Sequence, residues 1–328
     1  AYLRVTSIGI ADPMGYVISV VLICMSILAM WISARAMRGK DYATVQRGGG
    51  GLAKRQMRPW ESALAYAAVL IILLLVLAPH IGLLLLSFAT IWSFSPLPDG
   101  FTLAHYGRVF GESFIYVKNT FIYASLAGLI DVVLGTAIAY LVLRTRLVGR
   151  EWLDWTAMAA LAIPGVVLGI GYLRTFYGVQ LPDGTPLAAL WIMIVLALAI
   201  RRLPYALRAC YAALQQISVS LEEAAENLGA TKTRTIRRIV LPLMTGGILA
   251  GFVTSFATAA VELSATLMLV QSNADAPLAY GLYVFMQSAA GRGPGAALGV
   301  IAVLLVALCT FASHLIIEKS QKAKTAGH

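Results

Sequence analysis

The stretch ALAYAAVLIILLLVLA at residues 63–78 contains no charged side chain, and neither does VIAVLLVAL at 300–308. A bilayer core needs about 20 mostly apolar residues per helix, so these runs and their apolar neighbours are long enough to cross a membrane. Of the 328 residues, 59% are hydrophobic and 12% are charged, whereas an ordinary soluble domain has about 25% charged residues. The composition excludes a soluble globular protein and predicts an all-α, polytopic membrane protein.

Seven segments are apolar enough to be membrane spans, at about 13–33, 62–92, 117–143, 152–178, 187–207, 246–271 and 294–317. Most of the 25 Lys and Arg residues lie on one side of the membrane that these spans define; the exceptions are Arg4, Arg108, Lys118, Arg174 and Arg292. The positive-inside rule places the basic side in the cytoplasm, together with the C-terminal tail. Membrane topology therefore explains the net charge of +10 without nucleic-acid binding.

The spans divide the chain into four parts. The sequence begins with Ala1, without an initiator Met, and its first residues lack the pattern of a signal peptide. We therefore expect a missing upstream part, and we expect 1–33 to hold the last transmembrane helix of a preceding unit. Segment 34–61, basic and with four glycines at 48–51, predicts a flexible cytoplasmic linker. A six-helix domain at 62–317 and a cytoplasmic tail at 318–328 complete the chain.

The longest cytoplasmic segment predicts a helix, a sharp turn and a second helix at the membrane surface. Ser220 and Glu223 have the spacing of a capping box, which would begin the first helix. Gly229 would end it, since glycine readily adopts the positive φ of such a turn. Thr231 can cap the second helix, and Pro242 would end that helix before the next span.

Seven residues in this segment, 220–242, have a recognisable spacing: Glu223, Ala224, Ala225, Gly229, Ile239, Leu241 and Pro242. They resemble the EAA loop of the transmembrane permease subunits of binding-protein-dependent ABC importers. The resemblance implies a type I importer domain of six helices, here preceded by one extra transmembrane helix, in the inner (plasma) membrane. It also implies three partners: a cytoplasmic ABC ATPase dimer that receives the first loop helix, an extracytoplasmic solute-binding protein, and a second permease half, fused upstream or separate. The alternative for the loop is an amphipathic helix lying on lipid.

The sequence lacks the motifs of catalysis and of ATP binding. There is no Gly-x4-Gly-Lys-Ser/Thr phosphate loop, so ATP is expected on a separate chain and no cofactor on this one. The three cysteines and four histidines are too scattered to predict a metal site or a disulfide framework. We expect no enzymatic activity in this chain.

Charged side chains within spans are candidates for a translocation path, because a charge is costly in a bilayer. Asp131 lies in span 117–143, and a polar stripe in span 246–271 recurs every fourth residue: Thr254, Thr258, Glu262 and Thr266. Such spacing predicts one helix face, here lining the path in the outer part of the membrane. The alternative for Glu262 is a purely structural hydrogen bond to a neighbouring helix.

Two further features were interpreted structurally. Arg201 and Arg202 end span 187–207 and are interpreted as cytoplasmic topology anchors. Pro164-Gly165, followed by Gly169 and Gly171, predicts a break in span 152–178.

The layout, with IPGVVLG at 163–169 and ELSATLML at 262–269, is similar to the double permeases of ferric-iron importers. This resemblance implies iron(III) as the transported solute. Permeases for thiamine, aminoethylphosphonate and polyamines share much of the pattern and stay open as alternatives. A different class, an ion-coupled secondary transporter, would use Asp131 and Glu262 for coupling.

Overall fold

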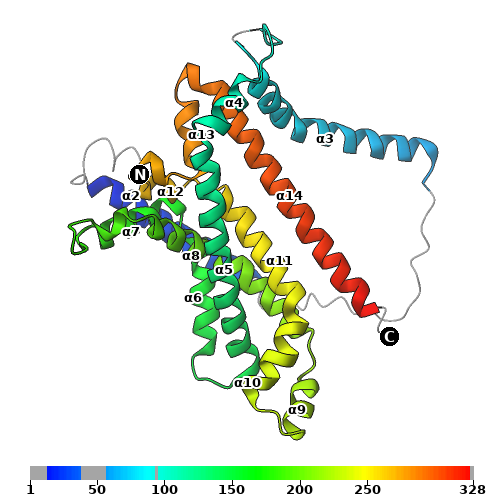
Figure 1. Cartoon of the computed structure of the whole chain (residues 1–328). Helices are drawn as coiled ribbons and strands as arrows, with labels where there is room; N and C mark the ends of the chain where they lie inside the picture. Colours follow the sequence, from blue (N-terminus) through cyan, green and yellow to red (C-terminus); the bar gives the residue numbers. More distant parts are fainter. Residues whose placement is uncertain (1–12, 38–56, 93–94, 326–328) are drawn as a thin grey trace.

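The computed structural model describes residues 13–37, 57–92 and 95–325, which form helices joined by mostly short loops (Figure 1). Within these ranges the only β-type pairings are two isolated bridges, Ala89 with Phe101 and Gln180 with Pro186. The prediction of an all-α membrane protein is therefore confirmed. Most of the predicted linker, including residues 48–51, lies outside the described residues.

The helices are α2 (Pro13–Met37), α3 (Pro59–Phe88), α4 (Ala104–Gly111), α5 (Phe114–Arg144), α6 (Arg150–Ala162), α7 (Gly165–Tyr177), α8 (Trp191–Gln215), α9 (Val219–Asn227), α10 (Lys232–Thr235), α11 (Leu241–Ala260), α12 (Thr266–Leu269), α13 (Leu278–Met286) and α14 (Arg292–Thr325). A π-helical turn, η2 (Ile236–Val240), joins α10 to α11. Short 3-10 turns are η1 (Leu187–Ala189), η3 (Asn273–Asp275) and η4 (Ala289–Gly291).

The centre of the bundle is formed by α5, α8 and α11, with α14 packed against α11. Glycines bring these helices close together. A Cβ on Gly135 of α5 would lie 3.0 Å from the Leu207 amide nitrogen of α8, and one on Gly247 of α11 would lie 2.3 Å from the Ala213 Cβ. Small residues stabilise membrane helices in this way, because close backbone approach increases van der Waals contact where water provides no driving force.

Helix α3 lies apart from this centre. It contacts α14 and α4 and otherwise runs away from the bundle (Figure 1). Its most apolar stretch has no residue buried inside the protein. Such a surface is stable only against lipid or another apolar protein surface.

Among the described residues, four helical segments are long and apolar enough to cross a membrane: Pro59–Phe88, Phe114–Arg144, Lys232–Ala260 and Ala289–Leu315. A fifth is possible if α6 and α7 count as one span, although they meet at 106°. The single span predicted for 152–178 is thus two helices, and the expected break is confirmed. Pro164 has no amide hydrogen and favours an extended residue before it, as seen at Ile163 with φ −86° and ψ 118°. The full arrangement of six helices plus one stays a prediction.

Helix α8 differs from the predicted span 187–207. It continues to Gln215, so Arg201 and Arg202 lie in its middle. The interpretation of these two arginines as anchors at the cytoplasmic end of a span is wrong. Their partners, described below, explain how two cations can lie inside the helical bundle.

Candidate functional site

Helix α9, which corresponds to the first helix predicted for segment 220–242, begins earlier than predicted. Its N-cap is Ser218, whose Oγ accepts a hydrogen bond from the Ser220 amide at 3.3 Å and lies 2.7 Å from the Ser220 hydroxyl. The predicted capping box of Ser220 and Glu223 is therefore wrong. Ser218 already caps the helix, and Ser220 lies within the first turn.

The turn after α9 depends on Gly229, as predicted. This residue has a φ of +84°, and no atom lies within 4 Å of the place where its Cβ would be. Its amide donates to the Glu226 carbonyl at 2.9 Å, and the Ala230 amide donates to the Ala225 carbonyl at 3.0 Å. This is the Schellman arrangement, which satisfies carbonyls that have no partner at a helix end. Glycine is required here for its backbone conformation and not for space.

One face of α9 and its turn is exposed to solvent. Leu221 is 47% exposed and Leu228 is 89% exposed. Glu223 and Ala224 are exposed as well, whereas Ala225 is buried against the rest of the protein. The EAA residues therefore separate into an outward pair and an inward alanine.

The second half of the loop continues into the membrane without a break. Thr231 caps α10 as predicted, since its Oγ1 accepts from the Arg234 amide at 3.4 Å. Beyond it, α10, η2 and α11 form one helical segment, so the prediction that Pro242 ends a helix is wrong. The π-helical turn gives the reason. The Leu241 amide donates to the Ile236 carbonyl, five residues back, and Pro242 follows in the first turn of α11, where its missing amide hydrogen costs little.

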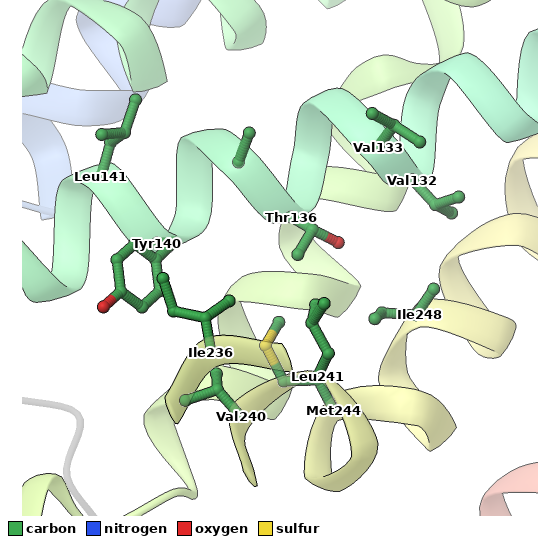
Figure 2. A pocket seen from close by; sticks show the side chains of 11 residues that line it. Val132, Val133, Thr136, Tyr140, Leu141, Ile236, Val240, Leu241, Met244 and Ile248 are labelled. Atoms are coloured by element: carbon green, nitrogen blue, oxygen red, sulfur yellow. The ribbon is translucent and has the colours of Figure 1, made fainter. Parts of the chain in front are cut away.

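An apolar cavity of about 530 Å³ lies between α5 and this segment (Figure 2). It is lined by Val132, Val133, Thr136, Ala137, Tyr140, Leu141, Ile236, Val240, Leu241, Met244 and Ile248. Among the predicted loop residues, Leu241 lines this cavity, Ile239 is half-buried and Pro242 is exposed. The packing of α5 against the start of α11 is therefore incomplete on this side.

Arg144, the last residue of α5, joins α9 to the bundle. Its Nε donates to Glu222 Oε1 at 2.6 Å, and its Nη2 donates to the carbonyls of Leu214 at 3.2 Å and Ile217 at 2.7 Å. The sequence alone does not predict this link. Glu222 directly precedes the EAA motif, but no local pattern connects it with an arginine 78 residues away.

The polar stripe predicted for 246–271 does not lie on one helix, because α11 ends at Ala260. Glu262 lies in the turn that follows, where its Oε1 accepts a hydrogen bond from the Ala265 amide at 3.3 Å. The Thr266 hydroxyl donates to the Glu262 carbonyl at 2.9 Å, and both side chains are buried. The structure therefore separates these two residues from Thr254 and Thr258, which lie on α11.

Glu262 is the centre of a buried charge cluster. Its Oε2 accepts a hydrogen bond from Arg202 Nη2 and lies 3.4 Å from Arg201 Nε. Arg201 also donates to the Ile163 carbonyl at 2.9 Å. A Cβ on Gly165 would lie 3.0 Å from the Arg201 guanidinium carbon, so only glycine allows α7 to begin this close. The cluster joins α8, the α6–α7 break and the turn after α11.

Asp131 is fully buried between α5 and α11. Its Oδ2 accepts a hydrogen bond from the Ser255 hydroxyl of α11, and Arg202 interacts with it electrostatically. Its Oδ1 has no hydrogen-bond partner among the described residues. Both candidate carboxylates, Asp131 and Glu262, therefore face the interior of this one helical bundle.

A groove of about 400 Å³ runs between α11 and α14, and it holds the other half of the predicted stripe. Its lining residues are Val253, Thr254, Ala257, Thr258, Val261, Val306, Thr310, Ser313 and His314. The hydroxyls of Thr254, Thr258 and Thr310 donate to carbonyls of their own helices. Polar groups are thus present in the groove at little desolvation cost.

The described residues contain no group of three or more His, Cys, Asp or Glu side chains that could hold a metal ion.

Comparison with known proteins agrees with these features. Residues 131–323 match the family model described as a binding-protein-dependent transport system inner membrane component. The chain is 33% identical over 184 residues to the ferric transport system permease protein FbpB of Actinobacillus pleuropneumoniae, covering 55% of this chain and 26% of that protein. It is 32% identical over 208 residues to the molybdenum transport system permease protein ModB of Escherichia coli K12, covering 61% of this chain and 91% of that protein. The chain spans about a quarter of the length of the ferric-transport permeases that it matches.

A solved structure of a bacterial ABC transporter involved in alginate import has the same fold. The TM-score is 0.61 at 18% identity, over 78% of this chain and 97% of that chain. The family match covers more than half of the sequence and includes the whole loop from α9 to α11. Permeases of this family are not themselves catalytic, carry no cofactor and act with a separate ATPase. The chain therefore belongs to the family of binding-protein-dependent transport system inner membrane components, the permeases of ABC importers.

Proposed function

We propose that this chain forms one permease half of an ATP-driven importer and that α9 is its docking helix for the ATPase. The observation that carries this proposal is Leu228, 89% exposed beside the turn at Gly229. Together with the exposed Leu221, it forms an apolar patch of the kind that marks protein interaction sites. Leu221 and Ala224 extend the same exposed surface, and the small Ala224 side chain allows a partner to approach closely.

The proposed orientation puts α9 and the C-terminus in the cytoplasm. Basic side chains near α9 and along the start of the following helix support it, namely Lys232, Arg234, Arg237 and Arg238. A solute-binding protein would then meet the opposite surface, near α4 and α13. The exposed apolar surface of α3 supports contact with a second permease half, because contact with lipid alone would not require α3 to separate from the bundle.

The proposed translocation path runs along the α11–α14 groove, at the contact between two permease halves. Thr254 and Thr258, with Ser313 and His314, supply polar groups there. A pair of halves facing each other across such a groove could open to water on either side in turn. In this proposal Asp131 and Glu262 hold the wall of the path in shape and do not contact the solute.

Iron(III) is the proposed solute, supported by the 33% identity with ferric transport permeases. A second candidate, molybdate, is supported by a relative that is matched over 91% of its length. Cells lacking the chain and complemented with it should accumulate radioactive ferric iron and not radioactive molybdate. Accumulation of molybdate and not of iron would make molybdate the proposed solute, and the importer proposal would be unchanged.

A docking experiment tests the role of α9 directly. Leu228→Asp should abolish co-purification of the ABC ATPase from detergent-solubilised membranes, because a charge cannot enter an apolar groove unpaired. Val148→Asp is the matched control: this residue is fully exposed in the α5–α6 loop, on the same side of the membrane, and its variant should retain the ATPase. If α9 instead lies on lipid, both variants will retain equal amounts of the ATPase, and the docking proposal fails.

A further inference from the structure

Arg144 bonds three groups from two other segments. Its guanidinium bonds Glu222 on α9 and two carbonyls, Leu214 and Ile217, at the C-terminal end of α8. The arginine itself is the last residue of α5. One side chain thus fixes the ends of two long helices relative to the short helix proposed to dock the ATPase.

The hydrogen bonds that Arg144 donates are charge-assisted and therefore strong. The Arg144 and Glu222 side chains are each only 10% exposed, so water screens their charges weakly. A hydrogen bond between two ionised groups is shorter and stronger than one between neutral groups, and 2.6 Å agrees with this. The Leu214 carbonyl also accepts from the Ile217 amide at 3.1 Å, and carbonyls at a helix C-terminus carry partial negative charge, so they favour a cation.

Other contacts between α5 and this loop are apolar, and they are interrupted. Ala139 and Leu143 of α5 pack in one cluster with Ile217, Val240 and Met244. Beside this cluster, the apolar cavity of about 530 Å³ lies between α5 and the segment formed by η2 and the start of α11 (Figure 2). A cavity removes van der Waals contacts that would make two helices move together. The Arg144–Glu222 ion pair adds a directional connection to this incomplete packing.

We propose that Arg144 is a positioning residue that makes α9, α5 and the end of α8 move as one body when the ATPase closes. This rests on the proposed docking function of α9. Without the link, ATPase closure would displace α9 relative to α5 and the end of α8, and its motion would reach the membrane helices only through α10, η2 and α11.

The test is a distance measurement within one chain, in the full-length protein assembled with its ATPase. Nitroxide labels are placed on exposed residues of α9 and α5, Val219 and Val133, after replacement of the native cysteines. Their separation is measured without nucleotide and after trapping with ATP and vanadate. The protein with Arg144 and Glu222 unchanged should give the same distance without nucleotide and after trapping. Arg144→Met should give a shifted or broadened distance after trapping, and more ATP should be hydrolysed per solute transported than in the unmodified protein.

Two further variants complete the test. Arg146→Met removes an exposed arginine two residues further along, in the α5–α6 loop, and should behave like the unmodified protein. If Arg144→Met does not assemble, Glu222→Gln decides, because it keeps the two carbonyl bonds of Arg144 and removes only the ion pair. An unchanged distance in Glu222→Gln or Arg144→Met, or a distance that already changes in the unmodified protein, would overturn the proposal. Retention of the ATPase is scored separately, so that a failure of docking is distinguished from a failure of the link.

Discussion

Glu262 and Arg202 form a buried ion pair that connects the turn after α11 with the middle of α8. The Glu262 side chain is 4% exposed and that of Arg202 is 13% exposed. Arg201 shares the same carboxylate and also holds the Ile163 carbonyl at the α6–α7 break. The turn after α11, the α6–α7 break and the middle of α8 are therefore held together by one carboxylate and two guanidinium groups.

Removal of the Glu262 charge should destabilise the protein. Glu262→Gln leaves two buried arginines without a counter-ion on this side, which costs about 3–5 kcal/mol. The unfolding temperature of the purified protein in detergent measures this loss. Glu112→Gln is the control, since its pair with Arg108 is 51% and 74% exposed and should be worth less than about 1 kcal/mol. Equal unfolding temperatures for the two variants would show that the buried pair adds no stability.

Gly229→Val should impair docking of the ATPase. A β-branched residue resists the observed φ of +84°, at a cost of about 1–2 kcal/mol, and the turn should lose its angle. Gly229→Asn should be milder, because asparagine visits this region more readily. Gly178→Val serves as the control: Gly178 has a φ of −76° and open space around it. Uptake and ATPase retention in membrane vesicles measure the effect, and normal values for Gly229→Val would contradict the assigned role of the turn.

The orientation can be measured with single cysteines in a protein freed of its native ones. Thr231→Cys should be protected from an impermeant thiol reagent added to intact cells, and Asp183→Cys, in the exposed loop after α7, should react. The opposite pattern would mean that the whole assignment of sides is reversed.

The groove between α11 and α14 should admit water. Thr258→Cys should react with a small polar thiol reagent, because Thr258 lines the groove. Leu249→Cys is the control, because Leu249 lies on α11 and is 42% exposed but is outside the groove. It should react at least about tenfold more slowly, since a cysteine thiol surrounded by lipid is rarely ionised to the reactive thiolate. Similar rates at both positions would remove the evidence for a path along this groove.

Local chemistry could be predicted from the sequence, and contacts between distant segments could not. Gly229 and Thr231 were assigned correctly because turn and cap preferences depend on a few adjacent residues. Pro164 marked a break for the same reason. The prediction that Pro242 ends a helix was wrong because the preceding π-helical turn allows the helix to continue through this proline. No residue pattern indicates such a turn.

The charged residues show the other limit. Glu262 has helical spacing with Thr254 and Thr258, but its pairing with Arg202, 60 residues earlier, outweighs the periodicity and α11 ends before it. Arg144 and Glu222 are joined in the same way across 78 residues. Such pairs depend on how the helices pack, so they cannot be predicted from the residue pattern of a single sequence.

The energy source of transport decides whether this chain is part of an ATP-driven importer. The protein is reconstituted into sealed vesicles with its ABC ATPase, and solute uptake is measured with the loaded binding protein on the opposite side. Our account predicts uptake that needs ATP on the ATPase side and persists when proton and sodium gradients are abolished. Uptake driven by an ion gradient, without ATP or without the ATPase, would contradict it.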